Sequence, residues 1–382
     1  MIIGIDASRA NKPNKTGTEW YSWHLIEELK KITLLPKEGV GGGLPSSDKF
    51  LLYTNNPLTG DLATLSANFS QRILNWPPKY LWTQIRLWWE LWRNTPDVLV
   101  VPAHTIPFLP LPKKIKILVN VHDVGWKRFP NLYKPIQIWY HDWTMRRIKQ
   151  RADVIITISE FSKREIMELY QVPAEKIKVV YLGFDSTQFS QQKNNNADAV
   201  LQKYKITKPY LLYVGRLEKK KNIGNMILAF ALAKEKFSDL KLVLAGSEGH
   251  QFEEIKKIIT EHKLENEVII TGYVDSVDLP IIYNQAQIFL FPTLYEGFGL
   301  PILEAMASGV PVITSDMNPH REVGGKSAVY TDPQSPERMA EIISNILTVD
   351  GFRTELIASG LERVKEFSWE KTAKEILEII LA

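Results

Sequence analysis

Short apolar runs alternate with amphipathic stretches along the chain, and this alternation restricts the fold more than any other feature of the sequence. Runs rich in Val, Ile and Leu suit strands that are buried on both faces, as in parallel sheets. Repetition of strand and helix therefore predicts an α/β fold. The expected strands are 1–8, 49–55, 72–76, 97–102, 116–123, 153–159, 178–183, 210–216, 240–247, 267–274, 288–293, 310–315 and 328–332. The expected helices include 19–31, 80–94, 163–170, 225–235, 251–263 and 335–347.

The length predicts more than one domain, because 382 residues exceed what a single hydrophobic core usually serves. A polar stretch at 186–200, rich in Gln, Asn and Lys, cannot bury a core and predicts a linker. We therefore expect two doubly wound Rossmann-like domains facing each other, at 1–185 and 208–367, with a linker at 186–207. Ligands of such sheets bind beyond the carboxyl ends of the strands, so the cleft between the domains is the expected site.

The composition narrows the classes of partner. A net charge of +4 fits anionic small molecules or an anionic membrane surface, and it is too small to indicate nucleic-acid binding. With no cysteine, the chain forms no disulfide and has no thiolate chemistry. The start, MIIGIDASRA, lacks the features of a signal peptide, and no apolar run reaches the roughly 18 residues of a spanning helix. We therefore expect a cytoplasmic protein.

The stretch LYEGFGLPILEAMASG places Glu296 and Glu304 eight positions apart. Gly297 and Gly299 loosen the backbone and Pro301 resists a helix that has already begun, so one helix cannot hold both carboxylates. The pattern predicts a tight loop that carries Glu296 and a helix with Glu304 in its opening turn. There the helix dipole would favour an anion or a hydrogen bond to a ligand. The alternative is the ordinary enrichment of acidic residues at a helix start.

A second polar cluster, VGRLEKKKN, follows an expected strand. Gly215 turns the chain, and Arg216 and Lys221 follow, five residues apart. A loop that opens onto a helix here could aim two cations and backbone N–H groups at a phosphate. The alternative is a solvated surface run, which is what we expect for Lys219 and Lys220.

In the first half, the strand of NVHDV ends with His122 and Asp123. A histidine at the carboxyl end of a strand, beside a carboxylate, is a candidate for contact with substrate. Metal binding is the competing hypothesis, with His104, His141 and Asp142 as co-ligands. Because their spacings match no zinc pattern, we predict no metal site.

Two glycine-containing turns also follow expected strands. Gly17 and Thr18 stand directly before a helix, where backbone N–H groups could meet a phosphate. The turn at Gly246 is less specific, since small-residue turns after strands are common in α/β proteins.

The stretch 80–94 is basic and aromatic. It contains Trp82, Trp88, Trp89 and Trp92 together with Arg86 and Arg93. We expect about half of the rings to be buried in a core. The others would form an exposed apolar face that suits a peripheral membrane contact or a lipid-linked acceptor.

Taken together, these motifs resemble glycosyltransferase family 4, a group of retaining enzymes with the GT-B fold. LYEGFGLPILEAMASGVPVITS contains that family's E-x7-E motif at Glu296 and Glu304, and VGRLEKKKN is similar to its G-R-L-x-x-x-K-[GN] element. PDVLVVPAHTIPFLP and VHDVGWKRFP resemble the mannosyltransferase-like branch. FSWEKTAKEILEIIL resembles a terminal helix, here 368–382, that returns to the first domain. The family's usual proline-glutamate-valine element is HREV here, at 320–323.

The resemblance implies a role for each candidate residue. Arg216 and Lys221 would hold the donor diphosphate. Glu304 would bind the ribose hydroxyls, and Glu296 would bind the hydroxyls of the transferred sugar. The other implied donor-binding residues are Gly215, Gly246, Phe298, Gly299 and Leu300. The N-terminal domain would supply His122 near the donor sugar, and Gly17, Thr18 and Asp123 around the acceptor or phosphate.

The expected reaction is transfer of a hexose from a nucleotide-diphosphate sugar to a glycan or lipid-linked acceptor. GDP-mannose is the donor we expect first, and UDP-sugars are the alternative donors. We expect neither a cofactor nor a metal, because Arg216 and Lys221 would stabilise the leaving diphosphate. Glu296 as a covalent nucleophile is the alternative mechanism. An epimerase or phosphorylase of the same fold, and a non-catalytic nucleotide-sugar-binding subunit, are the alternative functions.

Overall fold

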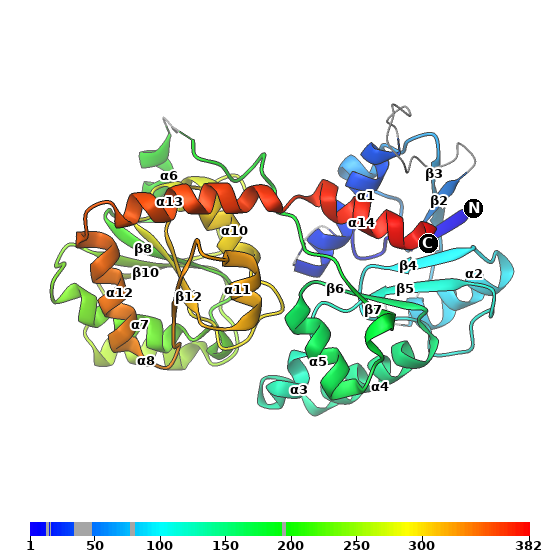
Figure 1. The fold of residues 1–382 in the computed structure, drawn as a ribbon, viewed down its shortest axis with the longest axis horizontal. Coiled ribbons are helices and arrows are strands. Elements are labelled where there is room, and N and C mark those ends of the chain that lie inside the picture. The colour runs from blue at the N-terminus through cyan, green and yellow to red at the C-terminus, as the bar shows by residue number, and fades with distance from the viewer. Residues whose placement is uncertain (13–14, 16, 34–47, 77–80, 193–195) are drawn as a thin grey trace. The chain divides into compact units, whose positions relative to one another are not determined.

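The computed structural model describes all residues of the chain except 13–14, 16, 34–47, 77–80 and 193–195. The chain divides into two compact units, Met1–Gly183 with Trp369–Ala382, and Phe184–Ser368. Each unit is a parallel sheet with helices against it, so the predicted α/β class with two Rossmann-like domains is confirmed (Figure 1).

The first unit contains a seven-stranded parallel sheet in the order β3-β2-β1-β4-β5-β6-β7. Its strands are β1 (Ile2–Asp6), β2 (Lys49–Thr54), β3 (Phe69–Ile73), β4 (Val98–Val101), β5 (Lys116–Asn120), β6 (Val154–Thr157) and β7 (Ile177–Val179). Its helices are α1 (Gly17–Ile32), the π-helical turn η2 (Trp82–Leu87), α2 (Trp88–Arg93), α3 (Gly125–Arg128), α4 (Pro135–Arg151), α5 (Glu160–Tyr170) and α14 (Trp369–Leu381). The single helix expected at 80–94 is therefore a π-helical turn followed by a short α-helix.

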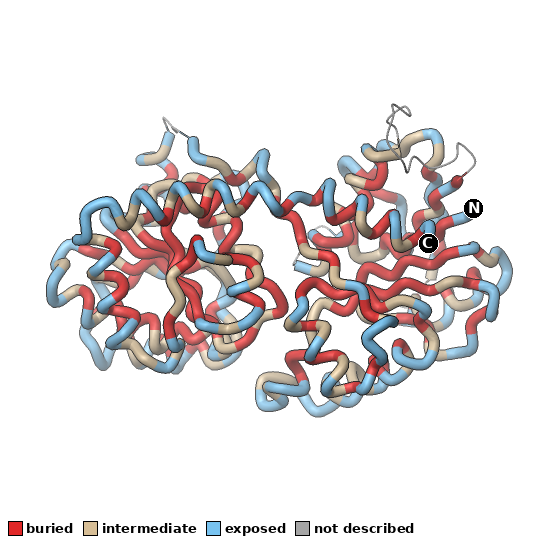
Figure 2. The backbone as a smooth tube through the Cα atoms, in the orientation of Figure 1, coloured by how far each residue is buried: buried red, intermediate tan, exposed pale blue. Residues whose placement is uncertain are grey.

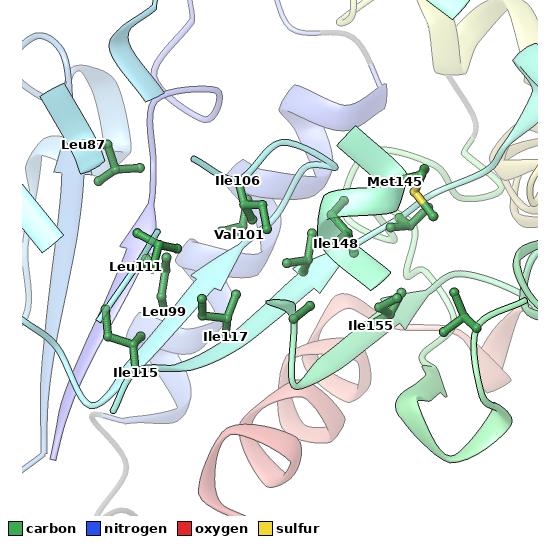
Figure 3. Packing of buried hydrophobic residues seen from close by; sticks show 14 of the residues in the cluster. Leu87, Leu99, Val101, Ile106, Leu111, Ile115, Ile117, Met145, Ile148 and Ile155 are labelled. Atoms are coloured by element: carbon green, nitrogen blue, oxygen red, sulfur yellow. The ribbon is translucent and has the colours of Figure 1, made fainter. Parts of the chain in front are cut away.

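The core of the first unit lies between the sheet and the helices that connect β3 to β4 and β5 to β7. Leu99 and Ile117 on the strands pack with Leu87 from η2 and with Met145 and Ile148 from α4 (Figure 3). On α1, the ring of His24 stacks on Trp369 of α14 at 4.6 Å, which holds the end of the chain in this unit.

The second unit contains a six-stranded parallel sheet in the order β10-β9-β8-β11-β12-β13. Its strands are β8 (Tyr210–Val214), β9 (Lys241–Ala245), β10 (Val268–Gly272), β11 (Ile288–Phe291), β12 (Val312–Ser315) and β13 (Val329–Thr331). Its helices are α6 (Ala197–Lys203), α7 (Ile223–Lys234), α8 (Phe252–Glu261), α9 (Leu279–Asn284), α10 (Leu300–Ala307), α11 (Asn318–Gly324), α12 (Pro336–Thr348) and α13 (Phe352–Arg363). Apart from the edge strands β3, β7, β10 and β13, the strands of both units are buried along most of their length (Figure 2).

The stretch expected as a linker, 186–207, lies in the second unit where the structure describes it. It contains α6, and Phe189, Val200, Leu201 and Ile206 within it are buried. Among the described residues, every helix is too short or too polar to cross a lipid bilayer.

Candidate functional site

The winding of the second sheet brings the two predicted motifs to neighbouring strands. The strand order reverses between β8 and β11, which pair directly through Leu212 and Phe289. The loop with Arg216 follows β8, and the loop with Glu296 follows β11. Ligands of doubly wound sheets bind beyond the carboxyl ends of the strands at such a switch point. The fold therefore joins two motifs that lie far apart in the sequence.

Lys221 and Glu296 form an ion pair across this switch point, and each side chain is largely buried. Burial opposes ionisation of Glu296, but the charges of Lys221 and Lys220 and the hydrogen bond from Lys221 hold its pKa below the usual value. Glu296 is therefore a carboxylate at neutral pH. Lys219 is exposed as predicted, whereas Lys220 is half-buried at the surface and lies 3.5 Å from Glu218.

Arg216 is exposed and sits between the β8 and β9 loops. The aliphatic part of its side chain packs over Gly249, where an added Cβ would lie 2.8 Å from Arg216 Cγ. Tyr213 Oη donates to its carbonyl oxygen at 3.1 Å. Within the described part of the chain, its guanidinium has no hydrogen-bond or ion-pair partner. It is therefore available for an anionic ligand.

Gly215 and Gly246 allow the ends of β8 and β9 to approach each other closely. Gly215 has φ +144° and Gly246 has φ +156°, conformations that L side chains rarely adopt. A Cβ on Gly246 would lie 1.9 Å from the carbonyl oxygen of Gly215. Both glycines are therefore required by the backbone geometry of the Arg216 loop, and direct contact with a ligand is not needed to explain them.

Glu304 lies on α10 and accepts a hydrogen bond from Tyr283 Oη at 3.0 Å. Burial raises the pKa of Glu304 to about 7, the negative charge of Asp185 adds to the rise, and the Tyr283 bond opposes it. Because α10 begins at Leu300, Glu304 lies one turn into the helix and not in the opening turn that we expected. Its charge state is therefore set by burial and not by the helix start.

The loop between the two glutamates is held tightly. Gly299 has φ +113°, and a Cβ there would lie 3.1 Å from Ile302 and 3.3 Å from His320. The Phe298 side chain is buried against Phe367, so it is not exposed to a ligand. Leu300 begins α10, whose first backbone N–H groups have no acceptor within the helix.

His320 supports this loop, and sequence reasoning singled it out only as a departure from the family motif. The ring is fully buried, its Nδ1 lies 2.7 Å from Thr314 Oγ1, and it packs on Phe291. Burial lowers its pKa to about 4 even though the charge of Glu296 opposes the shift. His320 is therefore a neutral support for Gly299 at physiological pH. The adjacent Arg321 pairs instead with Asp316 at 2.5 Å on the surface.

The switch point of the first sheet lies between β1 and β4, and three histidines gather beside it. His122 follows β5, and its Nε2 lies 3.1 Å from the Pro102 carbonyl oxygen. Burial lowers the pKa of His122, although that carbonyl and Asp123 oppose the shift. Asp123 Oδ1 accepts the backbone N–H of Gly125 at 2.9 Å, so the carboxylate also shapes the turn into α3.

His104 and His141 complete this cluster, with ring centroids 5.0 Å apart. Burial lowers the pKa of His104 to about 3, and the charges of His141, Arg9 and His122 add to the effect. Asp142, the third proposed metal ligand, binds Lys127, Trp126 and Tyr170 instead. In the described ranges, no group of three or more acidic or histidine side chains is placed to hold a metal ion.

The sequence analysis missed three charged residues, Glu19, Arg9 and Lys12, which form ion pairs near the start of α1. Glu19 is buried and accepts hydrogen bonds from Arg9 Nη1 at 3.3 Å and Lys12 Nζ at 2.9 Å. A Cβ added at Gly17 would meet no described atom within 4 Å. The Thr18 carbonyl accepts Ser22 Oγ inside α1. The sequence does not predict that Glu19 pairs with Arg9 and Lys12, because the pairing depends on where the fold buries Glu19.

Comparison with known proteins identifies the family. Residues 196–363 match the family described as Glycosyl transferases group 1, and residues 64–188 match Glycosyltransferase Family 4. The O-antigen chain mannosyltransferase B of Escherichia coli is 32% identical over 270 residues, which cover 70% of this chain and 71% of that protein. The chain belongs to glycosyltransferase family 4. The glycosyltransferase is also 29% identical to the O-antigen chain mannosyltransferase RfbU of Salmonella typhimurium, over 91% of its own length and 90% of that protein.

The same architecture occurs in solved structures. The crystal structure of HepE from Anabaena in complex with UDP-glucose matches with a TM-score of 0.70 and 18% identity, over 100% of the glycosyltransferase and 99% of that chain. At this identity the likeness shows the fold alone. The glycosyltransferase therefore has the two Rossmann-like units of the GT-B class, as its motifs predicted.

Proposed function

We propose that this glycosyltransferase transfers mannose from GDP-mannose to a glycan or lipid-linked acceptor, with retention of configuration and without a metal ion. The two O-antigen mannosyltransferases among its relatives support mannose as the sugar. UDP-sugars are the alternative donors, since HepE of Anabaena was solved with UDP-glucose. We also propose that the enzyme acts in the cytoplasm, which the lack of cysteine fits, and at the inner face of the membrane.

The observation that carries the proposal is the placement of Arg216 and the Lys221–Glu296 pair at one switch point. Cleavage of the sugar–phosphate bond leaves a diphosphate that gains negative charge. Arg216, Lys221 and the amide groups at the start of α10 would stabilise that charge where it develops. A preorganised donor of this kind is worth roughly 3–4 kcal/mol in the transition state. These groups would stabilise the leaving diphosphate, as a divalent cation does in other transferases.

The two glutamates would hold the sugar and the nucleoside. Glu296 is ionised and fixed by Lys221, so it can accept hydrogen bonds from sugar hydroxyls. Glu304, oriented by Tyr283, would accept hydrogen bonds from the ribose. We propose attack on the face that the phosphate leaves, with a departing phosphate oxygen taking the proton of the acceptor. Incubation with donor alone, followed by intact-protein mass spectrometry, should show no glycosyl adduct on Glu296.

The first unit would receive the acceptor. His122 and Asp123 follow β5 beside the sheet's switch point. Gly17 and Thr18 begin α1, and a Cβ added at Gly17 would meet no described atom within 4 Å. At neutral pH the lowered pKa of His122 leaves its imidazole neutral, so it can exchange hydrogen bonds with hydroxyls without attracting a second anion. We also retain the proposal that the stretch 80–94 contacts a membrane.

A donor screen tests the function. The purified protein is incubated with GDP- and UDP-sugars in excess chelator, with and without lipid-linked and glycan acceptors, and nucleotide release is measured. We expect acceptor-dependent GDP release from GDP-mannose that added magnesium does not increase. Donor conversion without any acceptor would indicate an epimerase or phosphorylase. Tight nucleotide binding without turnover would indicate a non-catalytic subunit.

A further inference from the structure

Three segments of the first unit expose large apolar side chains: η2 with α2, the loop between β4 and β5, and α4. We call this set the aromatic surface. Its members are Leu81, Ile85, Trp89, Trp92, Leu109, Ile136, Trp139 and Trp143. Exposed apolar patches of this kind usually mark a binding surface.

Side-chain contacts join the three segments into one surface. Trp88 Nε1 and Trp92 Nε1 on α2 each donate to the carbonyl oxygen of Pro110 at 2.8 Å. From the same loop, the ring of Phe108 packs against Trp143 of α4. Trp143 in turn stacks on Trp139, with centroids 5.6 Å apart and planes at 19°. The loop between β4 and β5 therefore bridges α2 and α4.

The fold itself does not require the outer face of α4 to be apolar. The inner face supplies Met145 and Ile148, which are fully buried in the core. Ile136, Trp139 and Trp143 recur at intervals of three and four residues on the outer face, and are 66%, 58% and 40% exposed. Helix α4 thus has an apolar stripe on two faces, and the outer stripe stays largely exposed even though Trp143 packs against Phe108.

The charges around the aromatic surface are positive. Arg93 follows Trp92, and Arg146 follows Trp143 along α4, and both are exposed. The acidic residues of these elements are already paired. Glu90 is buried against Arg72 and Arg86, and Asp142 binds Lys127. A cationic rim repels a second copy of the same surface and complements an anionic one.

We propose that the aromatic surface binds an anionic lipid bilayer, with the indole rings among the lipid head groups and the rim arginines on lipid phosphates. Indoles combine an apolar body with a polar N–H, and they favour the membrane–water interface. Basic residues with Trp on one face are the pattern of helices that lie in that interface. The proposal adds α4 and the β4–β5 loop to the membrane contact proposed for 80–94. It also specifies that the lipid bound there is anionic.

The proposal also links the membrane to the acceptor site, and in this respect it rests on the proposed function. Helix α4 carries Trp139 and Trp143 on its outer face, and from its other side His141 contacts His104. One helix would thus contact both the bilayer and the acceptor's surroundings. A lipid-linked acceptor would need little displacement from the bilayer to reach the site.

Vesicle flotation tests the binding without donor or acceptor, so its failure is distinguishable from failure of the proposed transfer reaction. The full-length protein is mixed with vesicles of phosphatidylcholine alone, or with ~30% phosphatidylglycerol, which supplies the negative surface potential. We expect binding to the anionic vesicles and at least about tenfold weaker binding to the neutral ones, since each basic residue contributes about fivefold.

Two double variants separate the two parts of the surface. Trp139→Ser with Trp143→Ser should weaken partition to both vesicles by at least about tenfold, because apolar area is lost. Arg93→Gln with Arg146→Gln should weaken binding to anionic vesicles by about 25-fold and leave neutral vesicles unchanged. The matched control is Tyr273→Ser with Val277→Ser, two exposed apolar residues of the second unit, which should bind as the parent does.

Circular dichroism and donor turnover in detergent-free buffer confirm that each variant is folded. Equal binding by the tryptophan variant and the parent would overturn the proposal, as would absence of binding to either vesicle. A concentration-dependent dimer that the tryptophan variant abolishes would assign the surface to a second copy of the chain, and would also overturn it.

Discussion

The switch points of the two sheets have the same winding but carry different chemistry. In the second unit the strand ends present an ion pair, Lys221–Glu296, and the exposed cation of Arg216. In the first unit they present His104 and His122, whose pKa values are lowered by burial so that both rings are neutral at pH 7. One scaffold thus supports a charged side that suits a diphosphate and a second side whose neutral histidines suit sugar hydroxyls. We call the second the neutral side after its histidines, although the charged residues Arg9, Glu19 and Asp123 also lie there.

The largest effect should come from removing a cation on the charged side. We expect Lys221→Ala to lower kcat by about 10²–10³-fold, because the leaving diphosphate loses one preorganised donor. Arg216→Ala should act similarly. The matched control is Lys219→Ala, an exposed residue in the same EKKK run, which should keep parental turnover. If turnover in Lys221→Ala matched that control, the charged side would not be the donor side.

The pH dependence of donor binding should belong to Glu304 and not to the histidines. The pKa of Glu304 is raised to about 7, so its carboxylate becomes protonated as the pH falls through 7 and no longer accepts two ribose hydrogen bonds. Donor Kd should rise about tenfold from pH 8 to pH 6, because the ionised fraction of a single group with a pKa of about 7 falls about tenfold over that range. Calorimetry measures donor Kd against pH for the parent and for Glu304→Gln. The variant should bind the donor more weakly, and its Kd should not change with pH. An equal slope in both would assign the pH effect to another group.

A smaller effect should follow from removing the neutral support of the charged side. We expect His320→Ala to lower the free energy of unfolding by about 2–3 kcal/mol, because it leaves a cavity and removes the hydrogen bond between His320 Nδ1 and Thr314 Oγ1. Donor KM should rise about fivefold as the Gly299 loop loosens. Denaturant unfolding and steady-state kinetics measure the two. Unchanged KM with reduced stability would show that His320 serves the core alone.

The smallest effect concerns the neutral side. Because a Cβ added at Gly17 would meet no described atom within 4 Å, Gly17→Ala should leave the free energy of unfolding within about 0.5 kcal/mol of the parent. If an acceptor approaches the backbone there, KM for the acceptor should rise and KM for the donor should not. Thermal unfolding and kinetics at varied acceptor concentration test this. If KM for the donor rose as well, Gly17 would be assigned to donor binding and not to acceptor binding.

Much of the charged side could be predicted from the sequence, because its residues cluster in two short motifs. The Gly297–Gly299 segment and Pro301 separate Glu296 from the helix of Glu304 by local backbone rules alone. The same rules did not locate Glu304 within the helix, because the first helical residue was uncertain by several positions.

Less of the neutral side could be predicted, because its residues come from separate elements. Glu19 and Arg9 are ten positions apart and pair only because Glu19 is buried at the start of α1. Helix α4 was not among the expected helices, since apolar residues on two of its faces blur the helical period. His141 was considered only as a metal ligand, and among the described residues no group of three or more acidic or histidine side chains is placed to hold a metal ion.

By itself, the sequence determined the alternation of strands and helices, the two-unit α/β class and the glycosyltransferase motifs, because these depend on local periodicity and on residues close together in the chain. The tertiary structure decided which motifs meet. It paired Lys221 with Glu296 by bringing the ends of β8 and β11 together. It also decided which tryptophans are exposed and which carboxylate titrates near neutrality. Burial and charge pairing depend on the surroundings of a side chain in space, and neighbours in sequence supply only part of those surroundings.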